Sequence, residues 1–364
     1  MSSSFRSQSS AKQVAIVGGG LIGLLCAHRL VAQGAEVTLF EARQPGAPGT
    51  PSGLQMHVFG AHQTLSSDRL EALVQARRAW STLEQSLDMQ LVFGRGVLRL
   101  ARADNAAGQE ALADYETQVT ASQIRNTTLD PIELAQTFPA FDWTTVGSGL
   151  WMPDWGVLFP RRVIARLRFL LEGKGLTVCA RQPVTAIDPA RGCVTWADGS
   201  AHFDQVILAA GAGIPALYPA ITETCRGYGY LRLTLHPSAE RVRALVRAPV
   251  VLDPEGSGLM ITTLEAGADL SLCSLGPVTD CPADAIPTAP QEARGHPSVK
   301  ALFERGIHMF QRPGDIAPKQ ARLFYELAAR DGEAVVHQDE RLTVLVSPTR
   351  DGGAVAPVLA EAAL

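Results

Sequence analysis

The stretch VAIVGGGLIGLLCAHRLVAQGAEVTLFEAR, residues 14–43, decides the fold. It opens on four aliphatic residues, passes through a glycine-rich segment and an apolar run, and reaches an acid at Glu41. A short run of consecutive aliphatics before a turn is typical of a buried parallel strand. The stretch therefore predicts a strand, a glycine turn, a helix over residues 21–33, a second strand over residues 36–40 and a terminal acid.

The glycines follow the pattern GxGxxG, with Gly18, Gly20 and Gly23 at the fixed positions. The first glycine permits a tight turn, the second lets the backbone approach a pyrophosphate, and the third lets the helix pack against the strand. The first helical turn, with Leu21 and Ile22, would present N–H groups and the positive end of the helix dipole to phosphates. We expect a dinucleotide to bind here.

The carboxylate of Glu41 follows the second strand, where it can accept hydrogen bonds from an adenosine ribose. It would repel a 2′-phosphate, so NADP is disfavoured. Two other interpretations exist for the same stretch: a structural glycine turn, and the apolar core of a secretion signal over residues 14–27. The apolar part is shorter than the roughly 20 residues that span a bilayer, and its glycines would weaken a signal helix.

Composition favours a globular chain in a reducing compartment. The 364 residues are 46% hydrophobic and carry a net charge of -4, which gives no basic surface for nucleic acid and no reason to expect membrane insertion. The six cysteines form no CxxC pair, so we expect no metal site and a cytoplasmic location. The serine-rich residues 1–10 are expected to be a disordered tail.

Periodicity along the rest of the chain predicts both helices and strands. A hairpin should turn at Asp198-Gly199 and return through an apolar strand at 206–209 to a small-residue run at 209–213. Short β-like runs fill residues 226–275. Helical patterns occur at residues 68–87, 104–125, 161–172, 299–310 and 320–327. No second GxGxxG follows a strand, which predicts a single nucleotide site.

Four motifs together resemble the D-amino acid oxidase (DAO) superfamily of FAD-dependent oxidoreductases, which includes glycine oxidase, sarcosine oxidase and the L-2-hydroxyglutarate oxidases. They are VAIVGGGLIG…VTLFEAR, GLWMPDWGVLFPRRV, FDQVILAAGAG and RGYGYLRL, and the resemblance runs from about residue 14 to residue 220. It implies an α/β fold with a Rossmann-like FAD-binding domain and a second, mostly antiparallel β-sheet substrate domain. The expected FAD-binding domain is discontinuous, over 11–85, 145–220 and 335–364, and the substrate or cap domain takes 86–144 and 221–334.

The resemblance also implies a set of FAD-binding residues. The pyrophosphate would lie on the glycine turn, the ribose on Glu41, and the adenine side near Ala42, Arg43 and the backbone of Val184. The remaining contacts would come from Ser52 and Gly53 near the isoalloxazine and from Ala210 and Gly211 along the cofactor. The implied chemistry is hydride transfer from a substrate C–H bond to the flavin, which performs the difficult step.

His57, Tyr228 and Tyr230 are the candidate catalytic residues. His57 falls in a loop after the nucleotide half-site, and in relatives resembling dimethylglycine dehydrogenase a histidine in a similar loop binds flavin covalently. The two tyrosines alternate on a strand that should face the flavin. The alternatives are a packed or solvated loop histidine and tyrosines that fill the core.

The C-terminal part departs from the family pattern. Val346 is expected at the position of an arginine that clamps the substrate carboxylate in relatives resembling glycine oxidase. The chain ends 12 residues after Gly352, so the helix that closes over the flavin is expected to be missing, together with its dipole. Arg226, Arg232 or Arg350 could supply the lost positive charge.

These features predict an FAD-dependent oxidoreductase that acts on the CH-NH2 or CH-NH group of an amino acid or secondary amine. One alternative is a 2-hydroxy-acid oxidase or dehydrogenase of the same superfamily. Another is a catalytically weakened flavin-binding subunit of a larger complex. The expected partners are a small-molecule substrate and either a partner subunit or a second copy of the chain.

Overall fold

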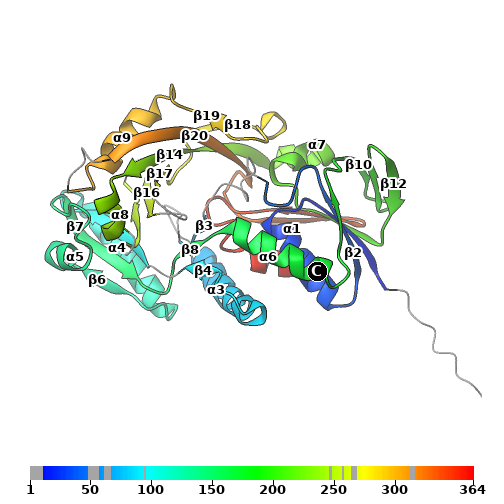
Figure 1. Cartoon of the computed structure of the whole chain (residues 1–364), viewed down its shortest axis with the longest axis horizontal. Helices are drawn as coiled ribbons and strands as arrows, with labels where there is room; N and C mark the ends of the chain where they lie inside the picture. Colours follow the sequence, from blue (N-terminus) through cyan, green and yellow to red (C-terminus); the bar gives the residue numbers. More distant parts are fainter. Residues whose placement is uncertain are drawn as a thin grey trace, which may run out of the picture.

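A computed structural model describes residues 11–47, 57–60, 67–93, 96–245, 248–255, 258–263, 269–311 and 316–364. Two large sheets organise the chain. Figure 1 shows the first sheet on the right, beside α1 and α6, and the second on the left, with β14 and β20 running along its top. The expected combination of a Rossmann-like sheet and a mostly antiparallel sheet is confirmed.

The first sheet has six strands in the order β21-β22-β13-β1-β2-β9. All neighbouring pairs are parallel except β21 with β22. The strands are β1 (Gln13–Val17), β2 (Glu36–Glu41), β9 (Thr177–Ala180), β13 (Gln205–Leu208), β21 (Val335–Asp339) and β22 (Leu342–Val346). With α1 (Leu21–Ala32) between β1 and β2, the predicted strand, turn, helix and strand are confirmed.

Both faces of this sheet are covered, which explains why its first strand is continuously apolar. Ile16 belongs to the cluster beneath α1, α3 (Ser67–Leu87) and α6 (Pro160–Glu172), and Val17 belongs to the cluster on the other face. That other face is covered by α7 (Ile214–Leu217) and by a small sheet of three strands. These strands are β10 (Val184–Asp188), β11 (Cys193–Trp196) and β12 (Gly199–His202), and β11 and β12 form the predicted hairpin.

The second sheet has ten strands and contains the predicted β-rich region. Nine follow the order β19-β20-β14-β17-β16-β15-β5-β7-β6, and β18 pairs with β14. They are β5 (Val97–Arg102), β6 (Thr127–Leu129), β7 (Val146–Met152), β14 (Cys225–Pro237), β15 (Val250–Asp253), β16 (Leu259–Thr263), β17 (Leu270–Ser274), β18 (Thr279–Pro282), β19 (Gln291–Glu292) and β20 (Ile316–Ala329). The predicted division places 145–220 with the first sheet, but β7 pairs with β5 in the second.

The helix expected at residues 320–327 is wrong, because this segment lies within β20. It pairs with β14 in antiparallel register along nearly its whole length. Ala321 and Leu323 point into the core, while Arg322 between them does not. The segment is rich in good helix formers, so pairing with a long neighbouring strand overrides its local propensity.

The remaining elements surround the two sheets. The predicted helix at 104–125 is α4 (Ala106–Ala121), and the one at 299–310 is α9 (Ser298–Ile307). The others are β3 (His57–Val58), β4 (Val92–Phe93), α5 (Pro131–Thr137), β8 (Val157–Leu158), α8 (Ala239–Leu245) and three short 3-10 turns at 211–213, 219–223 and 283–285. Within the described ranges, no helix has the length and apolarity needed to cross a membrane.

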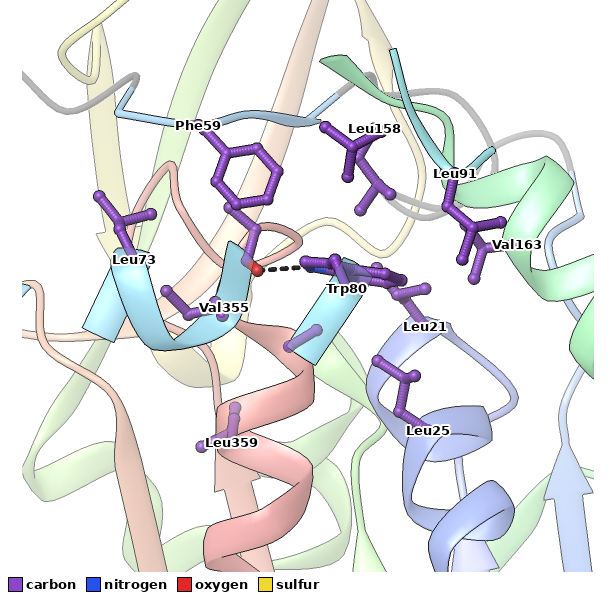
Figure 2. Close-up of a cluster of buried hydrophobic side chains, with 14 of the residues drawn as sticks. Leu21, Leu25, Phe59, Leu73, Trp80, Leu91, Leu158, Val163, Val355 and Leu359 are labelled. Carbon is purple, nitrogen blue, oxygen red and sulfur yellow. Dashed lines mark hydrogen bonds between the residues drawn. The ribbon is translucent and has the colours of Figure 1, made fainter. Parts of the chain in front are cut away.

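A helix does follow Gly352, contrary to expectation. α10 (Ala356–Ala362) begins with a proline in its first turn, which suits a helix start, and continues with alanine and leucine. It packs against α1 and α3. Figure 2 shows the indole of Trp80 among Leu21, Val355 and other apolar side chains, and its Nε1 donates a 2.7 Å hydrogen bond to the carbonyl of Ala354. The seven-residue helix α10 is stabilised at its N-terminal end by this hydrogen bond from α3.

Candidate active site

The glycine turn joins the carboxyl ends of three strands. Gly18 has φ +114°, and its N–H donates to Phe40 O at 2.9 Å. A Cβ on Gly18 would lie 2.4 Å from Ala209 O and 2.9 Å from Ala210 Cα. The turn after β1 is therefore in direct contact with β2 and with the segment after β13, and a side chain at Gly18 would separate them.

The turn leads directly into the N-terminus of α1. A Cβ on Gly23 would lie only 2.0 Å from Gly18 O, so a glycine is required for the helix to begin this close to the turn. Gly20 is the N-cap residue, no side chain caps the helix, and its first turn contains no acid. The positive end of the α1 dipole, at Leu21 and Ile22, thus lies at the glycine turn, where it favours an anion such as a pyrophosphate.

Glu41 is fixed beside this turn by two backbone N–H groups. Its Oε2 accepts from Gly19 N at 2.8 Å, and its Oε1 accepts from Arg43 N at 2.9 Å, which folds the chain at Ala42 around the carboxylate. Each carboxylate oxygen has further lone pairs, which can accept hydrogen bonds from sugar hydroxyls. The position and orientation of Glu41 fit the predicted contact with a ribose.

The other predicted cofactor residues lie around the same edge. Gln182 N donates to Glu41 O at 3.0 Å, and Val184 begins β10 two residues later. Ala210 adjoins Gly18, and Gly211 opens a short 3-10 turn. Ser52 and Gly53 lie outside the described residues. A bare-backbone turn, an uncapped helix end and a fixed carboxylate together fit an adenine dinucleotide, while the individual contacts stay predictions.

His57 is packed against the segment that precedes α10. A Cβ on Gly353 would lie 2.1 Å from His57 Cγ, so the imidazole lies directly on that backbone. Burial, together with the positive charge of Arg350, lowers the pKa of His57 to about 4. The imidazole is therefore neutral at pH 7.

Tyr230 and Arg350 stack at the junction of the two sheets. Arg350 Cζ lies 4.0 Å from the ring centroid of Tyr230, and Arg350 Nε donates to Leu275 O at 2.9 Å. Burial raises the pKa of the Tyr230 phenol well above its usual value. Arg350 has φ +65°, a backbone strain that in non-glycine residues tends to occur at functional sites.

Glu326 faces the same junction from β20. Its Oε2 accepts from Arg350 N at 3.3 Å, and burial raises the pKa of its carboxyl group. The sequence gives no signal for Glu326, because residues 320–327 have a helical pattern that obscures the strand alternation placing Glu326 opposite Tyr228 on β14.

Some candidate residues do not join this group. The hydroxyl of Tyr228 lies 3.5 Å from Arg330 O, and Arg226 forms a 2.8 Å ion pair with Asp280. Val346 is 2% exposed in the core of the first sheet. The expected loss of a substrate arginine at Val346 is therefore wrong, because that position faces the core and not the junction.

A cavity of about 30 Å³ opens on the second sheet at this junction. Arg232 and Arg350, two of the three arginines named from the sequence, both line it. The full lining is Tyr230, Leu231, Arg232, Met260, Thr262, Cys273, Phe324 and Arg350. The residues from β16 and β17 were missed because only the sheet register brings them beside β14.

Comparison with known proteins identifies the family. The sequence model described as "FAD dependent oxidoreductase" (DAO) matches residues 13–363, nearly the whole described chain. The chain belongs to this FAD-dependent oxidoreductase family. FAD is accordingly its cofactor, and the glycine turn and Glu41 of this DAO-family protein have the geometry to hold it.

Curated relatives share the family but are longer. The chain is 31% identical over 224 residues to the tRNA 5-methylaminomethyl-2-thiouridine biosynthesis bifunctional protein MnmC of Magnetococcus marinus. The aligned region covers 57% of this chain and 30% of MnmC. It is 24% identical over 207 residues to monomeric sarcosine oxidase of Bacillus sp. (strain B-0618). This aligned region covers 55% of this chain and 51% of the sarcosine oxidase. The matches span about a third to a half of these relatives.

Solved structures confirm the fold. L-proline dehydrogenase from P. horikoshii superposes with a TM-score of 0.81 at 14% identity, over 97% of this chain and 92% of that one. Glycine oxidase from Geobacillus kaustophilus gives 0.78 at 19% identity, over 96% and 93%. At these identities the similarity extends to the fold alone.

Proposed function

We propose that this DAO-family protein oxidises a C–N bond of an amino acid or secondary amine. When bound, FAD supplies the acceptor for the hydride that leaves the carbon beside nitrogen, and the product is an imine. The observation that carries this proposal is the stacking of Arg350 on Tyr230 at the junction of the two sheets, three residues before the Gly353 backbone on which His57 packs. Two relatives, monomeric sarcosine oxidase and 4-methylaminobutanoate oxidase, are named for the oxidation of amines, which supports an amine as substrate.

Each of the three side chains has a role in this proposal. Arg350 is held by Leu275 O and by the ring of Tyr230, so its guanidinium can orient an anionic substrate without first being ordered. A substrate ammonium must lose a proton before hydride can leave its carbon. His57 is neutral at pH 7 and so adds no positive charge beside the substrate, but with a pKa of about 4 it is too weak a base to take that proton, which must leave before the amine binds.

The cofactor contacts and the domain division form part of the proposal. The glycine turn, Glu41, Ala42, Arg43, Val184, Ala210 and Gly211 would hold the adenine nucleotide half of FAD, and Ser52 and Gly53 would approach its ring. We also place the protein in the cytoplasm, an assignment that six free cysteines support. A partner subunit or a second copy of the chain is likewise proposed, and the bifunctional relative MnmC gives this only weak support.

The test is an anaerobic reduction of the purified flavoprotein. Its visible spectrum is recorded before and after the addition of amino acids, secondary amines and 2-hydroxy acids. Loss of the flavin bands with an amine supports the proposal. Loss of the flavin bands with 2-hydroxy acids alone would favour a 2-hydroxy-acid oxidase or dehydrogenase. If no compound reduces the flavin, a non-catalytic flavin-binding subunit would be favoured. Acid precipitation also reports covalent attachment, since only covalent flavin stays with the protein.

A further inference from the structure

Arg69 is a buried arginine at a position that local chemistry disfavours. It lies in the first turn of α3, and its side chain is 4% exposed. A helix N-terminus carries a partial positive charge, so a cation there is unfavourable, and burial also removes most of the water that hydrates a guanidinium. Its ion pair with Glu333 is 3.6 Å long, and Glu333 is half-exposed. The other contacts of Arg69 therefore indicate what this side chain does.

Three donors meet at the carbonyl oxygen of Gly332, in the turn between β20 and β21. They are Arg69 Nη2, Thr349 N at 3.1 Å and Thr349 Oγ1 at 3.4 Å. Gly332 has φ +80°, and a Cβ on it would lie 3.1 Å from Thr349 Oγ1, so a glycine lets the turn come this close. This single carbonyl thus joins the start of α3, the β20–β21 turn and the segment that follows β22.

Arg350 directly follows Thr349, and its backbone and side chain are each held in place. Arg350 N donates to Glu326 Oε2 at 3.3 Å, and Arg350 Nε donates to Leu275 O at 2.9 Å. Asp351 N donates to Thr349 O at 2.7 Å, which closes a tight turn around Arg350, where φ is +65°. A left-handed backbone at a residue other than glycine persists only when its surroundings hold it. The position of Arg350 therefore depends on contacts from other elements.

Arg69 and Glu326 act on two consecutive backbone N–H groups from separate parts of the chain. Arg69 binds the carbonyl of Gly332, which accepts the N–H of Thr349, and Glu326 accepts the N–H of Arg350 directly. These contacts fix the backbone from which the Arg350 side chain extends. A guanidinium that is oriented before a ligand arrives loses less conformational entropy when the ligand binds.

We infer that Arg69 and Glu326 are positioning residues, which hold the segment of Thr349 and Arg350 so that the Arg350 guanidinium lies over Tyr230 before an anion binds. The inference rests on the role that the proposed function gives to Arg350. Neither Arg69 nor Glu326 is among the described residues that line the cavity beside Arg350. Each therefore acts through the backbone and not by touching the substrate.

The test measures the presentation of Arg350 to an anion without turnover. Acetate and its neutral analogue acetamide are titrated into the FAD-loaded protein at constant ionic strength, and the flavin absorption spectrum is the readout. Wild type is compared with Arg69→Met, Glu326→Leu and Glu326→Gln. The matched control is Arg102→Met, which removes a guanidinium side chain that is 14% exposed and that donates from Nε to Asp253 at 3.0 Å in the second sheet. The melting temperature and FAD content of every variant are also measured.

We expect Arg69→Met and Glu326→Leu to bind acetate about 10-fold more weakly than wild type. Glu326→Gln should stay within about 3-fold, because its amide oxygen can still accept from Arg350 N. Arg102→Met should lower the melting temperature and yet bind acetate within about 2-fold of wild type. The affinity for acetamide, which carries no charge, should be the same in all of the proteins.

Unchanged acetate affinity in either Arg69→Met or Glu326→Leu would overturn the inference. An equal loss in Arg102→Met would also overturn it, since lowered stability alone would then weaken anion binding. A wild-type protein that binds no acetate would do the same, because Arg350 would not be presented to an anion. If acetate binding changes as expected but no amine reduces the flavin, the proposed function fails and the positioning of Arg350 stands.

Discussion

Glu41 is held on both carboxylate oxygens by backbone N–H groups of residues that flank the cofactor edge. This arrangement fixes the carboxylate before any ligand arrives, so little side-chain entropy is lost on binding. From the sequence, the residue type and its place after the second strand were enough to identify it. The two hydrogen bonds that orient it depend on the fold of the turn and could not be predicted.

Glu41→Gln should weaken FAD binding by about 10- to 100-fold. An amide has only one acceptor oxygen, so its NH2 group would face one of the two N–H donors of Gly19 and Arg43. The measurement is quenching of free FAD fluorescence on titration into apoprotein. Glu36→Gln, at the exposed start of β2, is the matched control. Unchanged affinity in Glu41→Gln would remove Glu41 from the cofactor site.

His57 should make stability depend on pH in the acidic range. Its pKa in the folded protein is about 4, below the ordinary 6.5, so between these values the unfolded chain binds a proton that the folded protein does not. Stability is then fully present above pH 6.5 and decreases as the pH falls toward 4, by about 1–3 kcal/mol in all.

Urea unfolding of wild type and His57→Gln at pH 7 and pH 5 measures this dependence. We expect the loss of stability between the two pH values to be smaller in the variant, because its amide does not titrate. His202→Gln, an exposed histidine on β12, is the control and should retain the wild-type dependence. Equal pH dependence in wild type and His57→Gln would mean that His57 is not buried as a neutral group.

Two elements show where local sequence patterns are informative and where they fail. The strand, turn, helix and strand of residues 13–41 have the right periods, glycines and end signals, so the sequence predicts them closely. Residues 320–327 within β20 favour a helix, and their partner β14 lies far away in the chain, so the local pattern predicts the wrong element there. For the same reason Glu326 and Thr262, which strand register brings to the site, could not be found.

Trp80→Phe should destabilise the protein and release FAD more readily. The substitution removes the buried hydrogen bond to Ala354 O, which ties α3 to the segment between Gly353 and α10, and leaves that carbonyl without its donor. We expect a loss of about 1–3 kcal/mol in urea unfolding.

The control is Trp143→Phe, in which an equally buried indole loses a hydrogen bond to Phe138 O within the second core cluster. It should lower stability by a similar amount and leave the FAD dissociation constant unchanged. Equal effects of both variants on FAD retention would show that the contact of Trp80 has no particular connection with the cofactor site.

At the scale of the whole molecule, the site depends on the meeting of two sheets. The glycine turn and Glu41 belong to the first sheet, while Tyr230 and Arg232 belong to the second. Arg350 follows the last strand of the first sheet and stacks on a residue of the second. Family resemblance predicts both sheets, but the stacking of Arg350 on Tyr230 depends on how the two sheets meet and has no signal in the sequence.

FAD should raise the stability of the folded protein through binding alone. At a free concentration 100 times its dissociation constant, the increase is about 2.7 kcal/mol, which is visible as a higher melting temperature. FMN lacks the adenosine that Glu41 is positioned to hold, so the same concentration of FMN should give a clearly smaller rise. Equal shifts with the two flavins would contradict the role of the glycine turn and Glu41.

The strand orders have a consequence for biosynthesis. In the first sheet β1 and β22 both flank β13, and in the second β14 pairs along its length with β20, so each sheet joins early segments to ones more than 80 residues later. Such distant pairings form slowly, since the intervening chain must first be ordered. Until residue 329 has left the ribosome β14 lacks its partner β20, and until residue 346 has left it β13 lacks its partner β22. The nascent chain is then open to aggregation and needs protection before it can mature.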